Sequence, residues 1–295
     1  MPSPATPAGF LNIDKPTGIT SHDVVARCRK ILGTKKIGHA GTLDPQASGV
    51  LILCVGGATR LSEYVMASTK KYHATIHLGR ETTTYDIEGE LTSENSVDHI
   101  HRTEIESLLQ SFIGEIEQLP PAYSAIKQGG KKLYELARAG KTVELTPRKV
   151  VIHEIQVVGW QPPFLSVNIT CGAGTYIRSI AHDLGAALNV GGSLHNLRRI
   201  SSGAFRAENA VTLEVLQAST NPASFLIPPA AALSDWNQVI LKPDEITALR
   251  QGKITPHNSP ETPGDLALAI DTHGETIAVL QAVTEGWKPH KVLSS

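Results

Sequence analysis

Six consecutive apolar residues, VLILCV over positions 50–55, constrain the fold of this chain more than any other feature. A short, unbroken apolar run that follows a Gly-rich segment is typical of a strand buried in a sheet. A membrane-spanning helix would need about 20 such residues, and no apolar run in the chain approaches that length. The run therefore predicts a buried strand, and the chain is not expected to enter a membrane.

Other segments have the two-residue period of strands. Residues 70–79 (KKYHATIHLG) place Tyr72, Ala74, Ile76 and Leu78 on one face, which predicts a strand with one apolar side. Two more strands are expected over about 148–160 and 164–171, and a strand or strand pair over SLHNLRRISSGAF.

Helical periods occur between these strands. Thr20 and Ser21 are candidate N-caps of the first helix, with Asp23 three residues after Thr20 in the spacing of a capping box. A second helix near 103–113 has Thr103 and Glu106 in the same spacing. A third helix is expected after the Gly-rich corner CGAGTYIRS. The order of elements is neither strict strand–helix alternation nor all strand, so it predicts an α+β domain in which helices pack on a sheet.

A length of 295 residues allows about two domains. The Pro-, Ala- and Ser-rich residues 217–235 are interpreted as a linker or a wrapping arm. Beyond about residue 236, one short helix and several β-runs with Gly turns indicate a small β-rich module. We therefore expect a larger domain over 1–228 and a smaller one over 229–295.

The charges are unevenly distributed along the chain. Residues 1–80 carry 10 basic and 4 acidic side chains, residues 81–120 carry 1 and 10, and residues 121–210 carry 11 and 5. The two basic stretches would form a phosphate-binding surface if they share a face. Alternatively, they are separate solvated surfaces that favour solubility.

The cysteines and the first residues bear on the compartment. Cys28, Cys54 and Cys171 are far apart and form no CxxC pair, which argues against a disulfide framework or a cysteine zinc site. The start, MPSPATPAGF, lacks the basic and apolar regions of a signal peptide. Both observations favour a protein of the reducing cytoplasm.

Three residues are candidates for chemistry, and each also has a structural interpretation. Asp44 stands before a proline in HAGTLDP, where it faces a cleft or only closes a turn. Tyr72 stacks on a base or packs in the core. Arg178 pairs with a buried carboxylate or phosphate, or is an exposed residue of a first helical turn. The chain has no P-loop, no GxGxxG after a strand, no GxSxG and no HExxH, so neither nucleotide cofactors nor a metal are expected.

Six segments together resemble the successive blocks of the bacterial TruB-type tRNA pseudouridine synthases. They are GFLNIDKPTGITSHDVV, KKIGHAGTLDPQASGVLILCVGGATRL, KKYHATIHLGRETTTYDIEGE, LPPAYSAIKQGGKKLYELARAG, GTYIRSIAHDLG and LRRISSGAF. They cover about residues 9–206 in order. The C-terminal stretch resembles, more loosely, the small PUA-type RNA-binding barrel. The resemblance implies a mixed, largely antiparallel central sheet flanked by helices and loops, and the isomerisation of uridine 55 in the tRNA T-loop to pseudouridine.

The resemblance also implies roles for individual residues. Asp44 matches the catalytic aspartate, and Arg178 matches the arginine that partners its carboxylate. Contacts with the flipped-out nucleotide and its neighbours are implied for Tyr72, Tyr176, Leu197 and His39. Supporting or RNA-backbone contacts are implied for Lys15, Arg60, Lys131 and Lys132. Two positions depart from the usual pattern: Arg60 stands where relatives commonly have Lys, and Gly172-Ala173 replace a frequent Ser-Lys.

The reaction suits these residue types. A C–N glycosidic bond breaks, the uracil turns and a C–C bond forms at C5, so no ATP, metal or redox cofactor is required. The ionised Asp44 attacks C1′, acts as a base toward C2′, or attacks uracil C6, and the sequence leaves these three routes open. We expect a cytoplasmic monomer that binds the T-arm stem-loop of tRNA, with the basic residues 123–147 forming an insert that clasps the RNA.

Three alternatives remain at this stage. An RNA-binding or RNA-folding protein would not depend on the Asp44 carboxylate for its biological effect. A glycoside-hydrolase-like enzyme would need a second acidic residue, whereas the matched blocks supply an arginine and tyrosines. A sister synthase would act on a different RNA.

Overall fold

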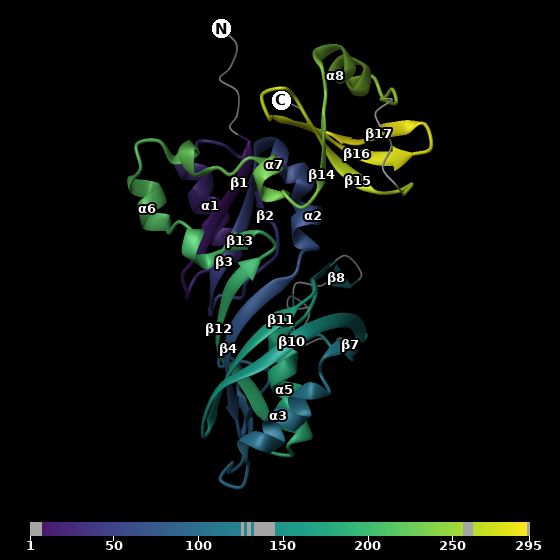
Figure 1. Cartoon of the computed structure of the whole chain (residues 1–295). Coiled ribbons are helices and arrows are strands. Elements are labelled where there is room, and N and C mark those ends of the chain that lie inside the picture. Colours follow the sequence, from purple (N-terminus) through teal and green to yellow (C-terminus); the bar gives the residue numbers. More distant parts are fainter. Residues whose placement is uncertain (1–7, 125–126, 129–130, 133–144, 256–261, 294–295) are drawn as a thin grey trace. The chain divides into compact units, whose positions relative to one another are not determined.

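The computed structural model describes residues 8–124, 127–128, 131–132, 145–255 and 262–293 (Figure 1). The chain divides into two units. Unit 1 comprises Met1–Pro45, Gly49–Met66 and Ser202–Ser295, and unit 2 comprises Gln46–Ser48 and Ala67–Ser201. None of the described helices combines the length and the apolar character that crossing a membrane requires.

Unit 1 is built from N-terminal and C-terminal segments of the chain. Its N-terminal elements are β1 (Gly9–Lys15), α1 (Ser21–Ile31), β2 (Ile37–His39), most of β3 (Ala47–Val55), the 3₁₀ helix η1 (Gly56–Leu61) and α2 (Ser62–Met66). β1 runs antiparallel to β3, with Gly9 opposite Val55 and Lys15 opposite Gly49. Every residue from position 50 to 55 is buried, which confirms the strand predicted from the apolar run.

Helix α1 begins as the sequence predicts. The Thr20 hydroxyl accepts a hydrogen bond from the Asp23 amide at 3.1 Å, and the Asp23 carboxylate accepts one from the Thr20 amide at 2.9 Å. This reciprocal pair satisfies two amides that a helix start leaves without partners. The helix then buries Val24, Val25 and Cys28 on one side.

The C-terminal part of unit 1 starts at the end of the long strand β12 (Gly192–Ser202). Its elements are β13 (Phe205–Arg206), η2 (Ala207–Asn209), α6 (Leu213–Ala218), η3 (Pro222–Phe225), α7 (Pro229–Ala232), β14 (Asn237–Ile240), α8 (Pro243–Arg250), β15 (Leu266–Ile270), β16 (Thr276–Val283) and β17 (Gly286–Val292). The last four strands form a sheet in the order β14-β15-β16-β17, with β14 parallel to β15 and the other pairs antiparallel. The β-rich C-terminal region is therefore present as predicted, while the boundary at 228/229 stays a prediction.

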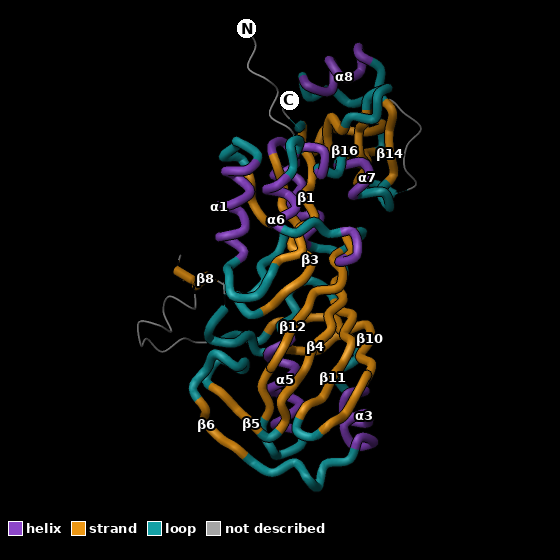
Figure 2. Tube along the Cα trace, turned by 90° about the vertical axis from the view of Figure 1, so that its left-hand side faces the viewer, coloured by secondary structure: helices purple, strands orange, loops and turns teal. Residues whose placement is uncertain are grey.

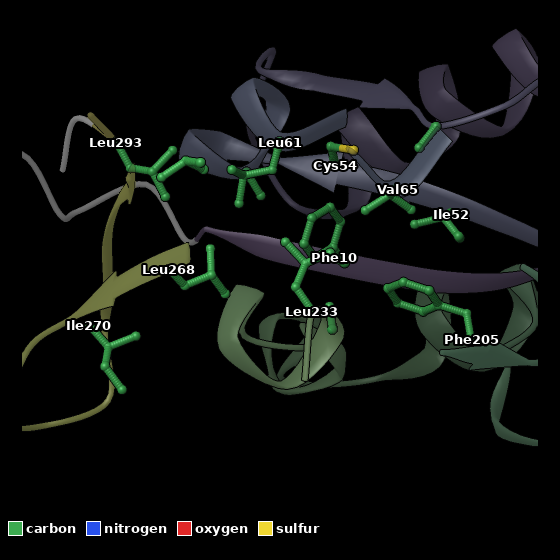
Figure 3. Packing of buried hydrophobic residues seen from close by; sticks show 14 of the residues in the cluster. Phe10, Ile52, Cys54, Leu61, Val65, Phe205, Leu233, Leu268, Ile270 and Leu293 are labelled. Atoms are coloured by element: carbon green, nitrogen blue, oxygen red, sulfur yellow. The ribbon is translucent and has the colours of Figure 1, made fainter. Parts of the chain in front are cut away.

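One hydrophobic cluster joins the two ends of the chain in unit 1 (Figure 3). The cluster contains Phe10 of β1, Ile52 and Leu61 of the N-terminal segment, and Leu268 and Leu293 of the C-terminal segment. Burial at about 25 cal/mol per Å² of apolar surface makes such a cluster the main stabilising contribution. The C-terminal sheet thus shares a core with the first strands.

Residues 217–235 behave as a wrapping arm rather than a free linker. Phe10 and Ile227 exchange two backbone hydrogen bonds of 2.8 and 2.7 Å, so the arm is bonded to the first strand. The segment also contains η3 and α7, which its Pro- and Ala-rich composition did not indicate. Of the two interpretations offered from the sequence, the wrapping arm is the one observed.

Unit 2 contains a largely antiparallel sheet with helices. Its elements are β4 (Lys70–Leu78), β5 (Arg80–Thr82), β6 (Leu91–Glu94), α3 (Arg102–Gln110), β7 (Gly114–Gln118), β8 (Lys127–Gln128), β9 (Lys131–Lys132), β10 (Arg148–Gln161), β11 (Phe164–Cys171), α5 (Ile177–Ala187) and β12 (Gly192–Ser202). The strand order is β12-β4-β11-β10-β7. α5 packs against β4, and α3 packs against β10 (Figure 2). Strand β4 buries alternate residues as predicted, and the mixed fold class is confirmed.

The predicted capping box of α3 is wrong. With Thr103 as the N-cap the helix would start at residue 104, but it begins at Arg102, and its N-cap His101 makes no side-chain capping bond. Thr103 therefore lies inside the first turn. Glu106 instead accepts a hydrogen bond from Arg102 at 2.7 Å, one turn earlier on the same face.

A close backbone contact joins α5 and β12. A Cβ atom on Gly185 would lie 2.1 Å from the Gly192 nitrogen and 2.2 Å from the Gly191 carbonyl carbon, far inside contact distance. Only glycine fits the helix at this point.

The predicted RNA-clasping insert, 123–147, falls largely outside the described residues. Within it, the backbones of Lys127–Gln128 and Lys131–Lys132 pair as a short antiparallel ladder.

Candidate active site

The segment before Asp44 is fixed by a serine of helix α1. The buried Ser21 hydroxyl donates to the Leu43 carbonyl and accepts from the Leu43 amide, both at 2.9 Å. Both backbone groups of Leu43 are thereby satisfied away from water. The residue immediately before Asp44 is thus held by the helix.

The segment after Asp44 is fixed as well. The Pro45 carbonyl accepts from the Gly18 amide at 2.9 Å and from the Lys15 ammonium at 3.1 Å. Lys15 is fully buried and also donates to the Pro16 carbonyl at 2.9 Å. Residues of the KPTGITS block therefore form hydrogen bonds with the GTLDP segment on both sides of Asp44. Asp44 itself is half-exposed.

Arg178 is a candidate residue of unit 2 with several hydrogen-bond partners. It lies in the first turn of α5 and donates to the Asp86 carboxylate at 3.2 Å, to the Tyr123 carbonyl at 2.9 Å and to the Thr84 carbonyl at 3.4 Å. The side chains of this ion pair are only 6% and 13% exposed. A buried guanidinium with a carboxylate partner is the first of the alternatives stated for Arg178, and it compensates for a charge that the helix dipole disfavours there.

Asp86 was not singled out from the sequence. One of its carboxylate oxygens accepts from the Thr84 hydroxyl at 2.5 Å and from the Glu88 amide at 3.0 Å, while the other meets Arg178. The Thr82 hydroxyl also donates to the Asp86 carbonyl at 2.6 Å. The available signal was an acid preceded by three threonines and followed by a glycine three residues later in TTTYDIEG, a pattern typical of a hydrogen-bonded turn.

Tyr176 is positioned by a second residue that the sequence did not reveal. The buried Gln118 side chain accepts from the Tyr176 amide at 2.8 Å and donates to the Tyr176 carbonyl at 3.0 Å. This two-point contact holds the residue that precedes α5, and the Tyr176 side chain is half-exposed. No spacing rule connects a glutamine at the end of β7 with a helix start 58 residues later.

The remaining candidates lie on strands. Tyr72 of β4 is 9% exposed and opposite Ile169, and Leu197 of β12 is buried. His39 of β2 is half-exposed and opposite Leu53. Unit 1 thus carries Lys15, His39, Asp44 and Arg60, and unit 2 carries Tyr72, Tyr176, Arg178, Leu197 and the backbone of Lys131–Lys132.

Arg60 contacts the C-terminal strand of its own unit. Its guanidinium donates to the Val292 carbonyl, and Lys291 of the same strand pairs with Glu63. The Lys291 ammonium also lies 5.3 Å from the centre of the Tyr64 ring. These contacts tie η1 and α2 to β17.

Burial shifts the pKa values of several ionisable side chains. Desolvation, followed by the nearby Arg199 charge, lowers the pKa of Lys70 to about 8. Burial raises the pKa of Cys28 and of Cys54 to about 12, so these free thiols stay protonated at neutral pH. In the described part of the chain, no three His, Cys, Asp or Glu side chains are grouped so that they could hold a metal ion.

Comparison with known proteins identifies relatives over nearly the whole chain. A family model described as "TruB family pseudouridylate synthase (N terminal domain)" matches residues 29–177, and one described as "tRNA pseudouridylate synthase B C-terminal domain" matches residues 178–226. The tRNA pseudouridine synthase B of Dehalococcoides mccartyi strain 195 is 43% identical and covers 97% of each chain. That of Symbiobacterium thermophilum is 50% identical over 78% of this chain and 77% of its own.

Two solved structures have folds similar to that of this chain. A chain of the "Crystal Structure of a Cbf5-Nop10-Gar1 Complex" superposes with a TM-score of 0.76 at 27% identity, covering 98% of this chain and 86% of its own. A chain of the "Structure of H/ACA RNP bound to a substrate RNA containing 2'-deoxyuridine" gives 0.75 at 25% identity, covering 99% and 86%.

Proposed function

The chain belongs to the TruB family of pseudouridylate synthases, and we propose that it converts uridine 55 in the T-loop of tRNA to pseudouridine. The relatives named tRNA pseudouridine synthase B support tRNA as the substrate. The observation that carries the proposal is the immobilised GTLDP segment, in which Ser21 and Lys15 fix the residues on either side of Asp44. A rearrangement that depends on one carboxylate requires the segment carrying that carboxylate to be held in a defined position.

Asp44 is the catalytic residue of this proposal. Its carboxylate acts on the flipped-out uridine while the glycosidic bond breaks, and the uracil re-attaches through C5. Arg178 steers that carboxylate, and Asp86 holds Arg178 in place through their buried ion pair. Because substrate and product are isomers, the reaction needs no metal, nucleotide or redox cofactor.

The nucleotide is held by rings and an apolar wall. Tyr72 and Tyr176 enclose the everted uracil, Leu197 forms the apolar side of the pocket, and His39 supports the neighbouring flipped-out bases. Eversion costs a few kcal/mol of stacking. Contacts between the basic stretches and the RNA backbone offset this cost.

Outside the pocket, the basic residues Lys131 and Lys132 of the 123–147 insert contact phosphates of the T-arm. Arg60 supports the enzyme through its contact with Val292 rather than through the substrate. Residues 229–295 bind RNA as a PUA-like domain, and the catalytic domain extends over 1–228. The enzyme acts in the cytoplasm as a monomer without an obligate protein partner.

Tritium release tests this function. The purified chain is incubated with an unmodified tRNA transcript carrying [5-³H]uridine, and pseudouridine is mapped by carbodiimide modification and primer extension. We expect one modified site, at position 55, and no product from a matched transcript with C at that position. A folded enzyme without product would refute the activity, and a product elsewhere in the RNA would identify a sister synthase with another target.

A further inference from the structure

Helix α5 holds the loop that carries Asp86 at two points. Arg178 and His182 are four residues apart and therefore lie on the same face of the helix. Arg178 contacts Thr84 and Asp86, as described above. His182 contacts the residue between them, because its ring stacks on Tyr85 with centroids 3.9 Å apart and an interplanar angle of 26°.

Tyr85 has a backbone conformation that needs support. Its φ of +63° lies in the left-handed region, which is disfavoured for a residue with a bulky side chain. Its carbonyl accepts from the Leu194 amide at 2.9 Å, and its amide donates to the Thr82 carbonyl at 3.2 Å. This conformation turns the Tyr85 ring toward His182 while its neighbours Thr84 and Asp86 contact Arg178.

His182 is itself fixed by two carboxylates. Its Nε2 lies 3.2 Å from a Glu81 oxygen of β5, and its Nδ1 lies 3.1 Å from an Asp183 oxygen of its own helix. Glu81 in turn accepts from the Ser93 hydroxyl of β6 at 3.3 Å. The imidazole is therefore held from three sides, counting the Tyr85 ring.

We propose that His182 is a positioning residue: by stacking on Tyr85 it maintains the left-handed turn that presents Asp86 to Arg178. The role rests on the proposed function, in which Arg178 steers the catalytic carboxylate. A shift of Tyr85 would move Asp86, its immediate neighbour, and so release the guanidinium. Errors of about 1 Å in such an arrangement can reduce rates by about a hundredfold.

The same contacts make the positioning depend on pH. Only the imidazolium form donates to both carboxylates, because a neutral imidazole has one N–H. Hydrogen bonding to Asp183 and the charges of Asp183 and Glu81 raise the pKa of His182 above its usual 6.5, although burial opposes them. Burial and the same two acids raise the pKa of Tyr85, so its hydroxyl stays neutral. The clamp is therefore complete below the pKa of His182 and weakens as the pH rises through it.

Two substitutions separate the ring contact from the charge. His182→Asn removes the stacking surface, whereas His182→Phe keeps a flat ring and removes both hydrogen bonds. The matched control is His153→Asn, which replaces an exposed histidine of β10. Single-turnover rates and tRNA dissociation constants are measured for each variant from pH 6 to pH 9.

We expect His182→Asn to slow the single-turnover step by about ten- to a hundredfold with an unchanged dissociation constant. His182→Phe should retain more activity and lose the part of the pH profile that titrates above 6.5. His153→Asn should match the wild type. Should His182→Asn fail to fold, His182→Phe carries the same test through its pH profile.

A double-mutant cycle in the single-turnover rate measures how far the effect of His182 acts through Tyr85. Asn tolerates the left-handed region, so Tyr85→Asn makes the clamp unnecessary, and His182→Asn should then cost little more rate. Wild-type kinetics in the folded His182 variants, an unaltered pH profile in His182→Phe, or strictly additive losses would each overturn the positioning role. An inactive wild type would remove the proposed function and this role together, whereas an active wild type with unaffected variants removes only this role.

Discussion

Replacing Ser21 by alanine tests whether the segment around Asp44 is positioned by helix α1. The Ser21 hydroxyl is the partner of both the Leu43 amide and the Leu43 carbonyl, each at 2.9 Å, and both residues are buried. Ser21→Ala removes both hydrogen bonds and changes little else, because alanine is well tolerated at the first position of a helix.

The magnitude follows from the two groups that lose their partner. A buried backbone group left without a hydrogen bond costs about 1–3 kcal/mol, so the pair would cost about 2–6 kcal/mol. Water that enters beside the half-exposed Asp44 would move the loss toward the lower end. A loosened segment that keeps its productive geometry a tenth of the time would reduce the single-turnover rate tenfold. This loss corresponds to about 1.4 kcal/mol.

The assay is single-turnover pseudouridine formation together with tRNA binding and thermal unfolding. We expect Ser21→Ala to lower the unfolding midpoint and the single-turnover rate while the tRNA dissociation constant stays near wild type. Ser224→Ala is the matched control, because its exposed hydroxyl donates only to the Asn221 carbonyl in its own turn, and its effect should stay within about 0.5 kcal/mol. A folded Ser21→Ala enzyme with a wild-type single-turnover rate would show that α1 does not position Asp44.

Three further substitutions test other parts of the account. Asp86→Asn keeps the shape but removes the charge facing Arg178, and it should cost about 3–5 kcal/mol in urea unfolding and lower kcat; unchanged stability would contradict the buried pair. Gly185→Ala places a Cβ atom against the backbone of Gly191 and Gly192 and should cost about 3 kcal/mol, the upper end of the usual cost of overpacking. A wild-type melting curve would refute this. Lys70→Met removes a cation whose pKa falls from 10.5 to about 8 on folding. The free energy of unfolding of the wild type should therefore rise relative to that of this variant between about pH 8 and pH 10.5, by at most about 1.4 kcal/mol per pH unit. A pH-independent difference in the free energy of unfolding would contradict this.

Local patterns predicted much of the fold. The apolar run at 50–55, the alternation along β4 and the Thr20 capping box each depend on neighbours a few residues apart, and each is observed. The Thr103/Glu106 box failed because the helix begins at Arg102, which makes His101 the N-cap and places Thr103 inside the first turn. A spacing rule identifies a helix more securely than its first residue.

The supporting residues of the site could not be predicted in this way. Asp86 meets Arg178 across 92 positions, Gln118 meets Tyr176 across 58, and Ser21 meets Leu43 across 22. Such pairings are created by the fold and leave no periodic signal. The resemblance to known blocks supplied Asp44 and Arg178, whereas the contacts that hold their segments came from the structure.

The most direct measurement of the central claim is pseudouridine formation by Asp44→Asn. Asparagine keeps the size and polarity of the side chain but provides no carboxylate. We predict no detectable pseudouridine at position 55 under single-turnover conditions, with a tRNA dissociation constant close to that of the wild type. Continued turnover by this variant would show that another group performs the reaction, and loss of binding together with turnover would show that Asp44 serves recognition rather than chemistry.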